Sequence, residues 1–88
     1  MEVITSEQRF WDACRCAPLV MTYVTNLLGS EATRWDFAKA IVRSGHVSTM
    51  FVCPDPQGEP LELWVSATNE RTGGWTLQHS ELPDPARR

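Results

Sequence analysis

Three cysteines and two histidines could supply sulfur and nitrogen ligands to a metal ion. Cys14 and Cys16 are two positions apart, while His46, Cys53 and His79 lie in the second half of the chain. A zinc site needs three or four such ligands at about 2.0–2.3 Å from the ion. Residues two apart on a helix point roughly 200° apart, so the Cys-x-Cys pair cannot easily chelate one ion. We therefore expect no metal, no cofactor and three free thiols that pack as small apolar side chains.

The same residues offer one conceivable nucleophile and base, Cys53 with His46 or His79. However, Cys53 directly precedes Pro54 at the end of an expected strand, and no nucleophile motif surrounds it. Each histidine is more simply explained as a strand residue.

Acid–base and phosphate-binding motifs are also missing. Glu59 and Glu62 flank the start of an expected strand, where a solvated acidic edge discourages aggregation between strands. Gly73 and Gly74 precede a strand rather than a helix, and no Lys-Ser/Thr pair follows them, so they indicate a turn. We expect the protein not to be an enzyme.

Trp64 has the residue type and surroundings of a binding surface. In the alternating stretch 61–68 it lies opposite the leucines and beside Glu62 and Ser66. If helices cover the leucine side, Trp64 is exposed, and an exposed tryptophan amid polar residues is typical of an interface. The alternative is that the tail or a crossing helix covers it.

The excess negative charge lies after Gly45. Residues 46–88 carry six acidic and three basic side chains, whereas residues 1–45 carry five of each. Such a surface speeds encounter with a basic protein and argues against nucleic acid as a partner, because it repels phosphates. We expect a protein partner with a basic surface and a binding site made of Asp55, Glu59, Glu62, Trp64 and Glu70. A homodimer is also compatible with the sequence.

The length and the hydropathy pattern predict one small domain. The first residues lack a basic start followed by an apolar run, which indicates no signal peptide. The longest apolar stretch, 17–28, is shorter than the roughly 20 residues of a membrane-spanning helix. With its odd number of cysteines, the chain is expected to be cytoplasmic.

Apolar residues before Gly45 recur at helical spacing. A first stripe runs from Phe10 to Leu28 and is interrupted by Pro18, so either one helix kinks there or two helices meet. The β-branched segment 19–25 is also compatible with a short strand. Gly29 and Ser30 suit a helix end and the next N-cap, which predicts a helix over 30–44 with Gly45 as its C-terminal cap.

After Gly45 the apolar residues alternate. The pattern predicts strands over 47–53, 61–68 and 75–80, with a type I turn at 55–58 and a loop at 69–74. The tail 82–88 is expected to fray. The predicted fold class is thus α+β over residues 1–88, with a helical half (1–45) packed on a three-stranded antiparallel meander (46–81).

These features favour a small protein-binding module. In size, acidity and lack of chemical motifs the chain resembles the stoichiometric inhibitors that phages encode against host machinery, anti-CRISPR proteins among them. The resemblance implies inhibition of a nucleic-acid-handling complex. The alternative function is a winged-helix DNA-binding regulator, with helices 18–27 and 30–44, a wing over 47–68, and Thr33, Arg34, Lys39 and Arg43 as the DNA-binding residues.

Overall fold

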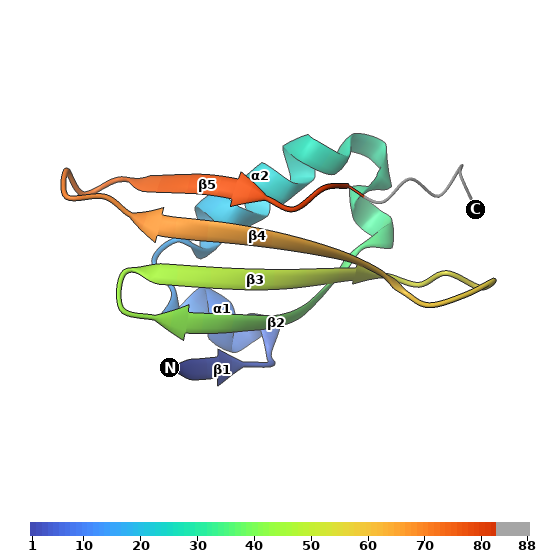
Figure 1. Ribbon diagram of the computed structural model, residues 1–88, viewed down its shortest axis with the longest axis horizontal. Helices are drawn as coiled ribbons and strands as arrows, with labels where there is room; N and C mark the ends of the chain where they lie inside the picture. The colour runs from blue at the N-terminus through green and yellow to red at the C-terminus, as the bar shows by residue number, and fades with distance from the viewer. Residues whose placement is uncertain (83–88) are drawn as a thin grey trace.

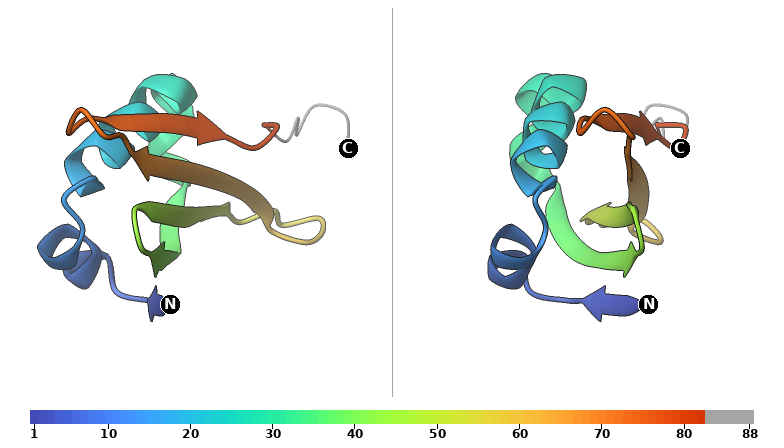
Figure 2. Two further views of the ribbon diagram at one scale, coloured as in Figure 1. Left: turned by 60° about the vertical axis from the view of Figure 1, so that its left-hand side comes forward. Right: turned by 90° about the vertical axis from the view of Figure 1, so that its left-hand side faces the viewer.

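A single antiparallel sheet with helices on one of its sides makes up the protein, as a computed structural model shows (Figures 1 and 2). The structure describes residues 1–82. In chain order the elements are β1 (Glu2–Ile4), α1 (Glu7–Ala13), α2 (Ala17–Leu28), the 3-10 helix η1 (Gly29–Arg34), β2 (Asp36–Arg43), β3 (His46–Cys53), β4 (Leu61–Asn69) and β5 (Trp75–His79).

The α+β fold class is confirmed, but the three-stranded meander is wrong. The strands predicted after Gly45 form β3, β4 and β5, and the order in the sheet is β1-β2-β3-β4-β5. Two strands that lie before Gly45 extend the sheet beyond β3. The helical part of the chain therefore ends at Arg34, not at residue 45.

The predicted helix over 30–44 does not form. After η1 the chain enters β2, which pairs with β3 from Asp36 to Arg43. Gly45 has a φ of 72° and lies in the two-residue turn between these strands. A positive φ suits a helix cap and a hairpin turn equally well, so the glycine was compatible with both structures.

Two helices meet near Pro18, which is one of the two arrangements that the sequence left open. Pro18 is the second residue of α2, where its missing N–H would have no partner within the helix. Segment 19–25 lies within α2 and is helical. The N-cap of α1 is Ser6, whose side chain accepts a hydrogen bond from the Arg9 backbone.

The core lies between the helices and one side of the sheet. The alternation predicted for β4 is confirmed, because Leu61, Leu63, Val65 and Ala67 are all buried. The turn predicted over 55–58 is present too, with the Gly58 N–H donating to the Asp55 carbonyl at 3.2 Å. The predicted frayed tail lies outside the described residues, except for the exposed Leu82.

An aromatic stack joins the helices to the sheet. The rings of Phe10 on α1 and Phe37 on β2 stack with centroids 5.2 Å apart, and Phe37 meets Phe51 on β3 edge-on at 6.2 Å. Phe10 is fully buried, whereas its neighbour Trp11 is 44% exposed. Because adjacent residues of a helix point in different directions, Phe10 enters the core while Trp11 faces solvent.

We expect Phe10→Ala to lower the free energy of unfolding by about 3–5 kcal/mol, since it leaves a cavity under Phe37. Trp11→Ala removes a larger side chain from a more exposed position, and we expect a loss below about 1 kcal/mol. Urea denaturation of both variants measures the difference. Equal losses would show that α1 does not dock through Phe10.

Candidate functional site

The side of the sheet opposite the helices carries a strip of apolar side chains. Within residues 1–82 no helix or strand lies over this side, as the end-on view shows (Figure 2). We call this surface the open face; its apolar members are Val3, Ile41, Met50, Val52 and Trp64. Val3 is 50% exposed and the other four are partly buried.

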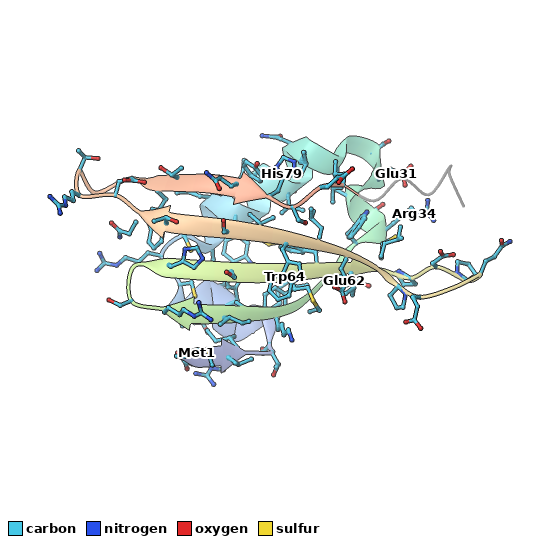
Figure 3. All side chains as sticks on the ribbon, in the orientation of Figure 1. Met1, Glu31, Arg34, Glu62, Trp64 and His79 are labelled. Atoms are coloured by element: carbon cyan, nitrogen blue, oxygen red, sulfur yellow. The ribbon has the colours of Figure 1, made fainter. Side chains whose placement is uncertain are left out.

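Trp64 lies at the middle of the open face, in front of the sheet in Figure 3. The strand register places Lys39, Met50 and Trp64 side by side on β2, β3 and β4. The Lys39 ammonium group is 5.9 Å from the centre of the Trp64 ring, a cation–π contact that reaches across Met50. Trp64 thus contacts Lys39 and is only partly exposed.

A β-bulge in β2 makes this contact possible. Phe37 pairs with Phe51, and Lys39 pairs with Met50, so Ala38 is the extra residue. Without the bulge, residues 37 and 39 would point to the same side of the sheet. With it, Phe37 packs under the helices while Lys39 lies on the open face.

Acidic residues gather at one end of the open face. Asp36 and Glu62 flank Val52 across three strands, and Asp55 and Glu59 lie in the loop that joins β3 to β4. The Asp55 carboxylate accepts a hydrogen bond from the Gln57 N–H at 3.0 Å. The structure thus brings three further acidic residues to the same end of the sheet as Glu62.

Glu70, the fifth residue expected in the binding site, lies elsewhere. It follows β4 at the other end of the sheet, where its carboxylate accepts a hydrogen bond from the Thr76 hydroxyl at 2.7 Å. The nine residues of β4 separate it from the β3–β4 loop. The predicted acidic set is therefore divided between two ends of the molecule.

The residues assigned to DNA binding do not share a helix. Thr33 and Arg34 belong to η1, where Arg34 pairs with Glu31 at 3.0 Å, and Lys39 and Arg43 lie on β2. Arg43 approaches the Met1 sulfur at 3.9 Å. Because a strand replaces the expected recognition helix, the winged-helix architecture is wrong.

The histidines are separated from Cys53. His46 and Cys53 are the first and last residues of β3, about 23 Å apart at the usual rise of a strand. The ring nitrogens of His46 lie 3.1 Å from the hydroxyls of Thr68 and Ser48. His79 bonds through Nδ1 to the Tyr23 hydroxyl. Neither arrangement presents a base to the thiol.

All three cysteines are free and buried. Burial raises the pKa of the Cys14 thiol, and the nearby charge of Glu2 raises it further. Burial, and then the neighbouring Cys14, raise the pKa of Cys16 to about 11. Both shifts disfavour the thiolate, which is the nucleophilic and metal-binding form. Within residues 1–82 no three His, Cys, Asp or Glu side chains are grouped to hold a metal ion.

A shallow depression of about 270 Å³ lies at the end of the sheet near the β2–β3 turn. Its lining includes Cys14, Arg15, Arg43, His46 and Trp75. Because the pKa of Cys14 is raised, the thiol there is not an activated nucleophile. The ring nitrogens of His46, which also lines the depression, contact the Thr68 and Ser48 hydroxyls.

Sequence reasoning found Trp64 and Glu62 but missed the other apolar members of the open face. Val3 and Ile41 were absent from the expected sheet because their strands were not expected. Met50 and Val52 lie in a predicted strand, and their alternation with Thr49 and Phe51 was the signal available for them. None of the helices in the described part of the chain is long and apolar enough to cross a membrane.

Comparisons of the chain with protein-family models, curated proteins and solved structures find no match. The arguments about function therefore start from the open face itself.

The raised pKa of Cys16 predicts an alkaline loss of stability. The unfolded thiol titrates near 9.0 and the folded one near 11, so the unfolded state loses its proton first. The free energy of unfolding should therefore fall by about 1 kcal/mol between about pH 8 and pH 10 from this group alone.

Denaturation of the wild type and of Cys16→Ala at several pH values isolates this contribution. The variant is expected to be less stable at pH 8, but its free energy of unfolding should fall by about 1 kcal/mol less than that of the wild type up to pH 10. Parallel declines in the two proteins would show that Cys16 does not titrate as described.

Proposed function

We propose that the protein is a small non-enzymatic binding module that holds a protein partner on its open face. The observation that supports this most strongly is the apolar strip on a sheet side that no described element covers. Contiguous exposed apolar surface on a small protein is typical of an interaction site.

The centre of the strip has the properties of an energetically dominant contact. Trp64 offers a large apolar surface, and Lys39 and the strand pairing already restrict its movement. Binding therefore costs the Trp64 side chain little conformational entropy, which favours affinity. Tryptophan is also among the residues that contribute most at protein interfaces.

Charge selects the kind of partner. Asp36 and Glu62 border the strip at one end, and the β3–β4 loop extends this acidic border through Asp55 and Glu59. Lys39 lies within the strip and Arg43 at its other end. A partner with an apolar pocket for Trp64 and basic side chains opposite Glu62 fits this distribution.

A basic surface of this kind occurs where proteins hold nucleic acid. A carboxylate-rich border beside an aromatic contact would occupy such a groove and exclude phosphates from it. The finer proposal is therefore stoichiometric inhibition of a nucleic-acid-handling complex. It predicts that added nucleic acid competes with the protein for its partner.

Trp64→Ala should abolish capture of the partner while the fold is kept, because the residue contributes little to the core. Trp11→Ala is the matched control, since it removes the same side chain from an exposed site on α1. Affinity capture from a lysate of the native host, followed by mass spectrometry, compares both variants with the wild type. We expect a loss of at least about 30-fold for Trp64→Ala and no loss for Trp11→Ala.

A protein retained equally by the wild type and by Trp64→Ala would disprove binding through the open face. Circular dichroism of the variants separates this result from unfolding.

Reversing the acidic border should slow association. The double variant Glu59→Lys and Glu62→Lys is expected to lower the association rate about tenfold or more at low salt, and to flatten its salt dependence. Its control is Glu7→Lys with Asp12→Lys on α1, which changes the net charge equally on the helical layer. Stopped-flow association with the captured partner measures both. Equal slowing in the two double variants would assign the effect to net charge.

A further inference from the structure

The two edges of the sheet differ in how well they are protected. The β1 edge is three residues long, and its Glu2 pairs with Arg9 at 3.0 Å. The β5 edge is five residues long and reads Trp-Thr-Leu-Gln-His, without an acidic residue, lysine, arginine or proline. Natural sheets usually protect an edge with charge, proline, a bulge or a short strand. Only β1 shows such devices.

The hydrogen bonds at the two ends of β5 show which of its backbone groups face outward. The Ser80 N–H donates to the Trp64 carbonyl at 2.9 Å, and the Glu70 N–H donates to the Gly74 carbonyl at 2.8 Å. In an antiparallel pair the hydrogen-bonded positions alternate. Residues 76 and 78 therefore face β4, and Trp75, Leu77 and His79 direct their N–H and C=O groups away from the sheet.

Apolar side chains border this free edge. Trp75 and Leu77 are partly buried on the helix side of β5. Beside them, the α2 residue Tyr23 bonds to His79, and Leu19 lies one turn earlier on the same side of α2 with 48% exposure. Among residues 1–82, the edge thus combines backbone groups that have no strand partner with apolar surface on α2.

We propose that two copies of this chain pair through β5, antiparallel and centred on Leu77. In this register Leu77 faces Leu77 of the second copy, and Trp75 faces His79 of the second copy. These are the three residues whose backbone groups point outward. Every outward N–H and C=O of the strand therefore finds a partner in the other copy.

The side chains are compatible with this symmetric pairing. On the helix side, Leu77 meets its own copy and extends the apolar surface that Leu19 and Tyr23 begin. On the open face, Thr76 lies opposite Gln78 of the second copy, so no like charges oppose each other. The acidic border around Glu62 is outside the β5 pairing, although each chain has a net charge of −3.

The dimer does not depend on the proposed function. It joins two five-stranded sheets into one, and it leaves both copies of Trp64 uncovered on the same side. A partner with a repeated or two-fold symmetric surface would then meet both open faces at once.

Charge exchange at Leu77 tests the register. We expect sedimentation velocity to show a dimer of the wild type at about 100 µM, and Leu77→Lys or Leu77→Glu alone to raise the Kd at least about tenfold. An equimolar mixture of the two variants should form the dimer again, because opposite charges then face each other. If both variants are folded and their mixture does not form a dimer, the proposed register is wrong.

A cysteine at the same position gives a second test that does not need a charged substitution. Directly opposed hydrogen-bonded residues have Cα atoms about 5.5 Å apart, within the range of a disulfide. Leu77→Cys should therefore form a covalent dimer on mild oxidation, whereas Val3→Cys, on the other edge, should not. The native thiols are buried and do not compete.

Three results would overturn the proposal: a wild type that stays monomeric up to about 500 µM, cross-linking of Val3→Cys but not of Leu77→Cys, or loss of the dimer in Trp64→Ala. The last result would assign self-association to the open face. Conversely, a dimer that persists in Trp64→Ala while partner capture is lost separates the two surfaces.

Discussion

The helical layer covers only one side of the sheet, and the rest of the structure follows from this constraint. Two helices of seven and twelve residues face five strands. A chain of this length buries a limited share of its surface, and residues 1–82 form one core with helices on one side of the sheet only. The core excludes water so completely that the polar residue Thr49 is buried there, with no hydrogen-bond partner for its hydroxyl within residues 1–82. The opposite side keeps partly exposed apolar residues, and the proposed binding of a partner rests on them.

The second half of the fold was predictable because its signals are local. Alternation along 61–68 and the turn residues at 55–58 depend on neighbours in the sequence. The first half was misread because the bulge at Ala38 interrupts the alternation of β2. Trp35, Ala38, Ile41 and Val42 then fall at helical spacing, although they belong to a strand and its approach. The three residues of β1 are too few to show any period.

The same distinction applies to the candidate site. Alternation in one strand was enough to place Trp64 and Glu62 on the side opposite the leucines. The neighbours of Trp64 come from β2 and β3 through the strand register, which depends on pairings that sequence patterns do not contain. Lys39 illustrates this point, because it was assigned to a DNA-reading helix and instead lies over the Trp64 ring. Glu70 was grouped with Glu59 and Glu62 because all three are acidic and lie in the second half of the chain. In the structure it lies at the other end of the sheet.

The strands lie in the sheet in the same order as in the chain, and this has a consequence for how the protein folds. The pairs β2–β3, β3–β4 and β4–β5 are closed by short connections, so each can form early at a small cost in chain entropy. Other contacts join residues far apart in the chain. For example, β1 pairs with β2 across both helices, and Tyr23 bonds to His79 across 56 residues. The hairpins would therefore assemble first, and the helices would seal the finished sheet last. If the helices dock last, the apolar side of the sheet is open to water until then, and slow docking would prolong the exposure of a surface that favours aggregation.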